Sequence, residues 1–197
     1  MRVRVPSVLL ALLIILALPS IVPAVGVQEA PSKGSSTSPS EIQVSDALGR
    51  SVTLEEVPSR IVLAGRATIM LVDALYLFPN VSDRVAAVGE TNQGIGDFFP
   101  VVDSNPDGKR RLGRSAGPEE IIAQNPDLVL LKSQMRDSLG SAIEATGVPV
   151  LYLDLETPDQ YSRDIRTLGT VLNQQQRAEE IVTQFQERTE ALLQATE

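Results

Sequence analysis

The chain has 197 residues, of which 43% are hydrophobic and 21% are charged, and its formal net charge at pH 7 is −8. This length allows one domain with a real core, and the acidic balance argues against nucleic acid as a partner. The absence of cysteine and histidine excludes disulfides, thiolate and imidazole metal sites, a cysteine nucleophile and Ser-His-Asp catalysis. Only oxygen ligands then remain for a bare metal ion. We expect no catalytic residue, no cofactor and no resident metal.

Residues 1–30 have the composition of an export signal. A short basic start precedes Val8 to Leu18, an uninterrupted apolar run of signal-peptide length. Pro19 and Pro23 shorten the continuous apolar helix below the ~20 residues that a membrane span needs. We expect a cleaved signal peptide, and the alternative is an uncleaved N-terminal anchor. Either one places the rest of the chain in the periplasm or on the extracellular face of the cytoplasmic membrane.

Residues 31–40, PSKGSSTSPS, are rich in serine and proline and predict a flexible linker. Such a linker can tether an exported domain to a membrane anchor. The alternative is the disordered N-terminus of the mature chain.

The next part of the chain alternates between strand and helix patterns. A loose alternation over residues 41–56, with a turn at DALGR, predicts a β-hairpin. Apolar runs and their stop residues then predict further elements. These are a strand at Arg60 to Ala64, a helix at Ile69 to Leu77 capped by Thr68, a strand at Arg84 to Gly89, a long loop at Glu90 to Asp107 and a short strand at Arg111 to Gly113.

The stretch GPEEIIAQNPDLVLL, Gly117 to Leu131, organises the second half. Pro118 suits a first helical turn, and the helix dipole favours the acids Glu119 and Glu120 there. Asn125-Pro126 ends this short helix, because the residue before a proline avoids the α region. The apolar run Leu128 to Leu131 is typical of a strand buried on both faces.

The same alternation continues to the end of the sequence, with a helix at Ser138 to Ala145, a strand at Val148 to Leu153, a helix from Thr157-Pro158 through Leu172 and an amphipathic helix at Gln174 to Glu197. The whole predicts an α/β fold, an open and mostly parallel sheet of about five strands with helices on both faces (a Rossmann-like lobe). Ligands of such sheets bind beyond the carboxyl ends of the strands.

The order of these pieces resembles a known family. DALGRSVTLEEVPSRIVLAG, DRVAAVG, the organising stretch, ATGVPVLYLD, RTLGTVL and RAEEIVTQFQER look like the N-terminal lobe of ABC-transporter substrate-binding proteins. The subgroup carries ferric siderophores, haem and cobalamin. The resemblance implies two α/β lobes joined by a long helix, with the ligand in the cleft between them. Residues 41–172 would be the first lobe and 173–197 the start of the connecting helix. The sequence given holds no second lobe, so we expect a fragment or a prematurely ended reading frame, and the alternative is a natural half-length protein.

Loops after the strands should face the cleft, and they supply the candidate ligand-binding residues Arg66, Thr68, Asn92, Gln93, Phe98, Arg114, Ser115, Lys132, Gln134 and Arg136. Four of these are cations in an acidic protein, which favours an anionic ligand because guanidinium pairs bidentately with carboxylate-like oxygens. The alternative is ordinary solvated loop charge. Phe98 could stack on an aromatic ligand, or it could anchor the loop in the core.

The resemblance also implies a docking residue. An acid at the start of the helix before PDLV pairs, in that family, with arginines of the membrane permease. Glu119 has the matching position, and Glu120 would replace it if the register shifts. The alternative is an acid that only interacts with the helix dipole.

These observations predict an exported substrate-binding component of an ABC importer, most simply for an iron-siderophore or a similar anionic metal chelate. Its partners would be the chelate and a permease dimer. Two alternatives are the N-terminal half of an exported α/β enzyme and a cell-surface interaction domain without a transport role. Against an enzyme, the strand-end loops hold neither a glycine-rich phosphate cradle nor a recognised nucleophile setting.

Overall fold

The computed structural model describes residues 41–195 except residues 93 and 95. The predicted signal or anchor and the predicted linker lie outside these described residues, as does Gln93. The described part belongs to one compact unit, Thr37–Glu197. It begins with the predicted hairpin, in which β1 (Ile42–Ser45) pairs antiparallel with β2 (Ser51–Leu54).

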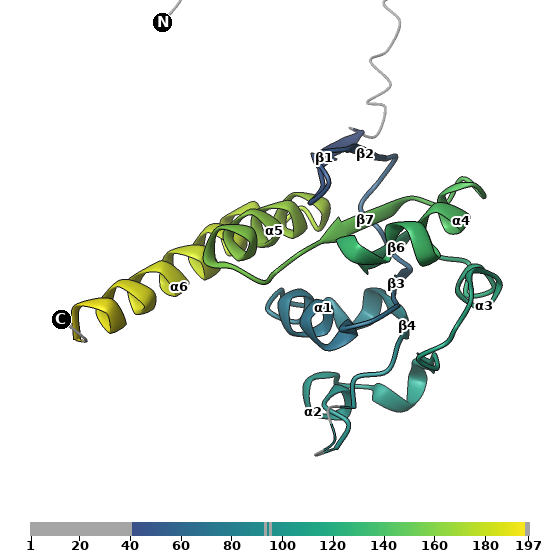
Figure 1. The fold of residues 1–197 in the computed structure, drawn as a ribbon, viewed down its shortest axis with the longest axis horizontal. Helices are drawn as coiled ribbons and strands as arrows, with labels where there is room; N and C mark the ends of the chain where they lie inside the picture. The colour runs from purple at the N-terminus through teal and green to yellow at the C-terminus, as the bar shows by residue number, and fades with distance from the viewer. Residues whose placement is uncertain (1–40, 93, 95, 196–197) are drawn as a thin grey trace, which may run out of the picture. The chain divides into compact units, whose positions relative to one another are not determined.

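A five-stranded sheet follows, and every pair of neighbouring strands in it is parallel (Figure 1). Its spatial order is β5-β4-β3-β6-β7. The strands are β3 (Ile61–Leu63), β4 (Val85–Val88), β5 (Arg110–Arg111), β6 (Leu128–Lys132) and β7 (Val150–Leu153). This sheet confirms the predicted fold class, and the strand positions agree with the sequence to within a few residues.

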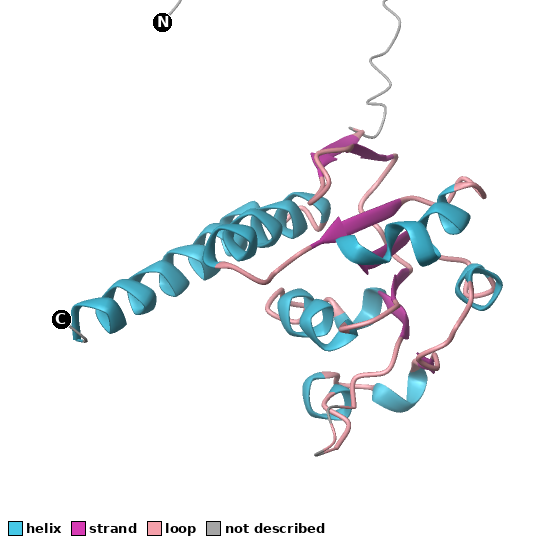
Figure 2. Ribbon diagram, in the orientation of Figure 1, coloured by secondary structure: helices cyan, strands magenta, loops and turns pink. Residues whose placement is uncertain are grey.

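Short helices connect the strands, and two longer helices end the chain (Figure 2). The α-helices are α1 (Thr68–Leu75), α2 (Phe99–Val102), α3 (Pro118–Ile122), α4 (Ser141–Glu144), α5 (Pro158–Val171) and α6 (Gln175–Ala195). Three-residue 3-10 turns lie at Ser82–Arg84, Pro106–Gly108 and Ser133–Met135. The helix predicted over Ser138 to Ala145 is instead a π-helical turn, Arg136–Gly140, that runs into α4.

Both faces of the sheet are buried, which explains why its strands are apolar runs rather than alternating patterns. Leu128 and Leu130 of β6 belong to a core cluster that includes residues of α1, α5 and α6. Val129 and Leu131, which alternate with them, belong to a second cluster with Ile121 of α3 and residues of the π-turn and α4. Helices therefore cover both faces, as the sequence predicts.

The start of α5 is fixed by its sequence. Thr157 accepts a hydrogen bond from the Gln160 backbone N–H, and the Gln160 side chain accepts one from the Thr157 N–H. This reciprocal capping satisfies donors that the first helical turn leaves open. In contrast, Thr68 is not the predicted cap of α1. The cap position is Ala67, and Thr68 is buried with its hydroxyl donating to the Gly65 carbonyl at 2.9 Å.

The hairpin is attached to the sheet by a charged cluster. Arg50 pairs with Asp46 at 2.8 Å and with Glu144 at 2.7 Å, and its guanidinium lies 4.4 Å from the centre of the Tyr152 ring. The backbone N–H of Ala47 also donates to the Tyr152 carbonyl. These contacts hold β1 and β2 against β7 although the hairpin forms its own two-stranded sheet. None of the helices within the described residues has the length and apolar character to span a bilayer.

Candidate functional site

The strand order creates one place where the chain changes direction across the sheet. From β3 the chain adds β4 and β5 on one side, and it then returns to add β6 and β7 on the other side. The helices that follow β3 and β6 consequently pack on opposite faces of the sheet. Ligands of open α/β sheets bind in the crevice at such a switch point.

A hollow of about 650 Å³ lies at this edge and is lined by Gly65, Arg66, Ala67, Ile69, Met70, Glu90 and Arg114. An adjoining hollow of about 610 Å³ shares Gly65, Arg66 and Arg114, and it adds among others Ser115, Gln134, Met135 and Ser138. We call the two together the switch-point pocket. Its walls come from the loops after β3, β4, β5 and β6, so four separate segments of the sequence meet there.

The loop after β3 is shaped by its backbone. Gly65 has φ 81° and Ala67 has φ 55°, both in the left-handed region. A side chain at Gly65 would be strained, and its Cβ would lie 3.1 Å from Cγ of Met135. The glycine therefore allows the β3 loop to approach the loop after β6. Between these two positions, Arg66 is exposed at the pocket.

Arg114 reaches the pocket from the loop after β5 and is paired there with an acid. Its Nε donates to Oε2 of Glu90 at 2.9 Å, with 72% of the arginine side chain and 38% of the glutamate side chain exposed. The hydrogen bond from Arg114 to Glu90 and the nearby negative charge raise the pKa of Arg114, which is charged in any case. The pocket thus holds two arginines and one compensating carboxylate.

Lys132 was predicted in the loop after β6. It is instead the last residue of that strand. Its side chain is 1% exposed. The Nζ atom lies 3.1 Å from Oε1 of Glu156 and 3.7 Å from Sδ of Met70. Since Met70 lines the switch-point pocket, this ammonium lies behind the pocket wall rather than at its surface.

A second charged cluster lies beyond Lys132. Asp154 accepts hydrogen bonds from Ser133 and from Arg163, the latter at 2.9 Å, while Asp164 accepts the backbone N–H groups of Asp154 and Leu155. Burial alone would raise the pKa of Asp154, but the bonds from Ser133 and Arg163 outweigh it and hold the pKa below its usual range. This cluster fixes the start of the loop after β7.

The long loop after β4 is held by its own polar network. Thr91 is buried and donates to Asp97, and Arg111 pairs with Asp97 at 3.0 Å. The Arg111 guanidinium also lies 4.6 Å from the centre of the Phe99 ring. Burial alone would raise the pKa of Asp97. The hydrogen bonds from Thr91, the Phe99 N–H and Arg111 outweigh burial and hold this pKa below its usual range, so the carboxylate stays ionised.

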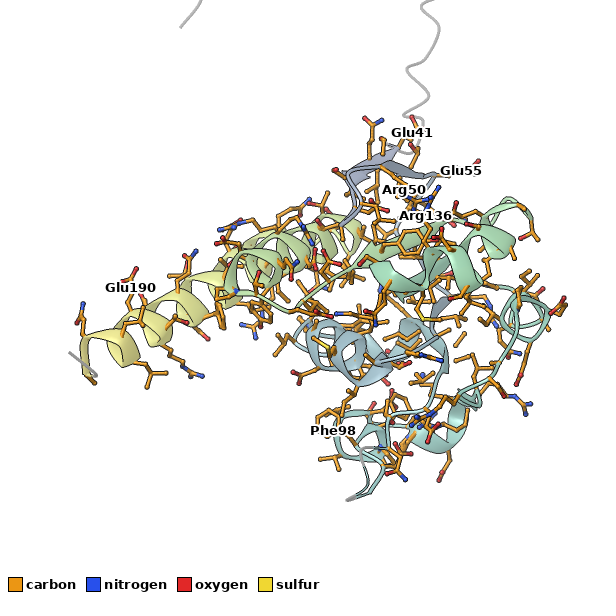
Figure 3. The ribbon with its side chains drawn as sticks, viewed as in Figure 1. Glu41, Arg50, Glu55, Phe98, Arg136 and Glu190 are labelled. Carbon is orange, nitrogen blue, oxygen red and sulfur yellow. The ribbon has the colours of Figure 1, made fainter. Side chains whose placement is uncertain are left out.

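Other predicted residues of this loop lie within its own structure. Asn92 forms an isolated bridge with Asp97 and accepts from the Gly94 N–H at 2.8 Å. Phe98 is half-buried and packs against the core, and Phe99 is fully buried, edge-on to Tyr76 with ring centres 5.9 Å apart. Phe99 is therefore a loop anchor. Phe98 and Arg136 lie far apart in Figure 3.

The structure therefore brings together four of the ten predicted ligand-binding residues: Arg66, Arg114, Ser115 and Gln134 all line the switch-point pocket. Five others do not line it: Thr68 and Lys132 are buried behind it, and Asn92, Phe98 and Arg136 lie elsewhere on the described part. The tenth, Gln93, is outside the described residues. Glu90, Met70 and Met135 also line the pocket and were not among the predicted residues. Glu90 follows a predicted strand directly, so the strand-end argument that selected Arg66 also applies to it.

The two predicted docking acids lie in the first turn of α3. Glu119 is exposed and, within the described residues, forms no ion pair, whereas Glu120 lies 3.9 Å from Nη2 of Arg110. Among the described residues no group of three or more acids is arranged to hold a metal ion.

Comparison with known proteins adds a family. A family model described as periplasmic binding protein matches residues 67–197. No protein of curated function matches the chain in sequence.

Several solved structures share its fold. A TroA-like periplasmic binding protein, FepB, from Veillonella parvula is 20% identical with a TM-score of 0.61, covering 75% of this chain and 47% of that one. An ABC-type Fe3+-hydroxamate transport protein from Saccharomonospora viridis is 27% identical with a TM-score of 0.57, covering 76% and 54%. The molybdate-bound periplasmic protein MolA from Haemophilus influenzae is 17% identical with a TM-score of 0.56, covering 71% and 49%. The chain spans about half the length of these structures.

Proposed function

The chain belongs to the periplasmic binding protein family, and on that premise we propose that it provides the first lobe of the extracytoplasmic substrate-binding component of an ABC importer. Residues 41–172 form this lobe, residues 173–197 begin the inter-lobe helix, and residues 1–40 are the export signal or anchor with its linker. The family and the matching structures are substrate-binding proteins rather than enzymes, so the enzyme alternative loses its support.

The proposed ligand is an anionic metal chelate of the iron-siderophore kind. The observation that carries this proposal is the convergence of Arg66 and Arg114, from loops after two different strands, on the switch-point pocket. Two guanidinium groups can pair with carboxylate or catecholate oxygens at once. Met70 and Met135 supply polarisable apolar wall beside them, which suits the organic body of a chelate. Neighbours that carry Fe3+-hydroxamate and molybdate support a ligand with exposed oxygens.

The test uses gallium as a diamagnetic replacement for ferric iron and follows the 15N-labelled chain by NMR. A catecholate chelate of strongly negative charge is compared with a hydroxamate chelate of near-neutral charge. Replacing both residues, Arg66→Ala with Arg114→Ala, should weaken the catecholate complex at least tenfold, about 1.4 kcal/mol. The melting temperature should not fall, because both side chains are exposed.

Arg166→Ala is the matched control, since Arg166 is an exposed arginine in a 2.8 Å pair with Glu179 on the two terminal helices. It should leave the catecholate affinity unchanged. Unchanged affinity in the double variant, or tighter binding of free gallium than of either chelate, would refute the anionic-chelate proposal.

We propose further that Glu119 docks on the permease. Its position in the first turn of α3, exposed and without an ion partner among the described residues, leaves its carboxylate available to a cation of another protein. Glu119→Arg should abolish stimulation of the ATPase in a reconstituted transporter and leave chelate binding intact. Full stimulation by this variant would assign Glu119 to the helix dipole alone.

A further inference from the structure

Glu90 occupies an unusual place for an acid in a pocket proposed to bind anions. It directly follows Gly89 at the end of β4, lines the switch-point pocket beside Arg66, and accepts the Nε–H of Arg114 at 2.9 Å. Its carboxylate therefore lies where an anionic group of a ligand would meet Arg114. The loops that carry the two residues follow neighbouring strands, since β4 pairs with β5.

The Arg114–Glu90 ion pair contributes little to the stability of the fold. The Arg114 side chain is 72% exposed, and exposed ion pairs contribute only about 0–1 kcal/mol to stability. The loop after β4 is already held by the buried Thr91 and by the Asp97–Arg111 pair. In the part of the chain that the structure describes, Arg114 is the one ion partner of Glu90.

We propose that Glu90 is a specificity-determining residue, an internal anion that occupies Arg114 until a stronger ligand displaces it. The inference rests on the proposed function, since it concerns the same pocket. A tethered carboxylate acts at high effective concentration and competes with dissolved anions for the guanidinium. It also repels any anion that approaches Arg114 from the pocket side.

Displacement favours ligands with several anionic groups. A small oxyanion that meets Arg114 alone exchanges one ion pair of Arg114 for another, so the net free energy of its binding is small. A multidentate chelate engages Arg66 as well, and because the exposed pair is weak, that additional contact is enough to displace the carboxylate. Specificity arises as a difference between the two affinities, through a repulsive element as well as an attractive one.

The experiment follows the Nε–Hε resonance of Arg114 in the 15N-labelled full chain while sodium sulfate is added at constant ionic strength. Glu90→Gln should lower the half-saturating sulfate concentration at least threefold relative to the unmodified chain. The control Glu179→Gln changes a comparable exposed carboxylate on α6, which pairs with Arg166 of α5, and it should change nothing at Arg114. Backbone spectra of each variant show whether the fold is kept.

The same variants are then titrated with the gallium–catecholate chelate. Glu90→Gln should improve sulfate binding by a larger factor than chelate binding, so that discrimination between the two falls. Equal sulfate responses in Glu90→Gln and the unmodified chain, or a weaker response in the variant, would overturn the inference. If no variant binds the chelate but the sulfate responses differ as expected, the proposed function fails, while the inference that Glu90 competes with dissolved anions for Arg114 stands.

Discussion

At the scale of single residues, Asp154 shows how the strand-end clusters couple charge to stability. It receives hydrogen bonds from Ser133 and Arg163, and its pKa lies below the ordinary value although burial opposes this. In the unfolded chain the pKa is about 3.9. A carboxyl group with a lower pKa in the folded state stabilises the fold above the unfolded pKa, and this contribution is lost as the pH falls through the folded pKa.

We therefore expect Asp154→Asn to lower the free energy of unfolding at neutral pH, by about 1.5–3 kcal/mol for a charged hydrogen-bonded group. The deficit should shrink as the pH is lowered below about 4. Urea unfolding at a series of pH values measures it. Asp137→Asn, at a side chain that is 96% exposed, should leave the pH dependence unchanged. A pH-independent deficit at Asp154 would show that shape rather than charge is responsible.

Residues at strand ends also show which site residues can be predicted from the sequence and which cannot. The rule that ligands bind beyond the carboxyl ends found Arg66 and Arg114, because the position of a strand end can be read from an apolar run. It placed Lys132 in a loop because a charged residue normally ends a buried run. The structure buries this lysine because Glu156 and Met70 cover its ammonium, and both come from distant parts of the chain. Such long-range compensation leaves no local pattern.

At the scale of elements, the contact between α5 and α6 depends on one glycine. Gly169 lies where α6 crosses closest, and a Cβ there would collide with Cβ of Ala178 and approach the Gln174 carbonyl at 3.2 Å. Gly169→Ala should destabilise the chain by about 1–3 kcal/mol through overpacking, despite the better helix propensity of alanine. Urea unfolding measures this loss.

The rescue variant keeps that prediction specific. Ala178→Gly introduced beside Gly169→Ala removes the colliding methyl group and should recover part of the loss. No recovery would mean that the backbone of Gln174, and not the Ala178 side chain, limits the approach of the helices.

Helix ends were predicted well where a proline or a capping residue marks them in the sequence. Thr157-Pro158 starts α5 as predicted, and α3 ends at Ile122, shortly before the predicted stop at Asn125-Pro126. The prediction failed at Thr68 and at Arg136–Gly140. Thr68 is fixed by the unusual backbone of Gly65 and Ala67, and the π-turn brings Gly140 against the Tyr152 hydroxyl. Neither close approach is visible in a hydrophobic pattern.

At the scale of the whole molecule, the sheet order was beyond the sequence, since apolar runs do not say which strands are neighbours. The central strand β3 pairs with β4, which follows it closely, and with β6, where Ile61 lies opposite Leu128. A chain cut after residue 126 lacks β6 and β7 and leaves one edge of β3 open. We expect it to show no cooperative unfolding transition by circular dichroism.

A chain cut after residue 174 retains all five strands of the sheet and the helices α1, α3, α4 and α5 that cover the two faces of β6. It loses α6, with its buried Ala178, Ile181 and Val182, and should still unfold cooperatively at a lower urea midpoint. A cooperative transition in the chain cut after residue 126 would show that β3, β4 and β5 are a folding unit by themselves.

The position of β3 also determines when this protein can fold. Its partner β6 is synthesised only after α1, the long loop and α3, so the middle of the sheet cannot close until Lys132 has left the ribosome. Pairing between strands so distant in sequence makes folding slow, because the closure entropy is lost before the contacts form. A chain of this topology folds more slowly than a helical bundle does. That delay suits the export that we propose, because a polypeptide crosses the membrane before it becomes compact.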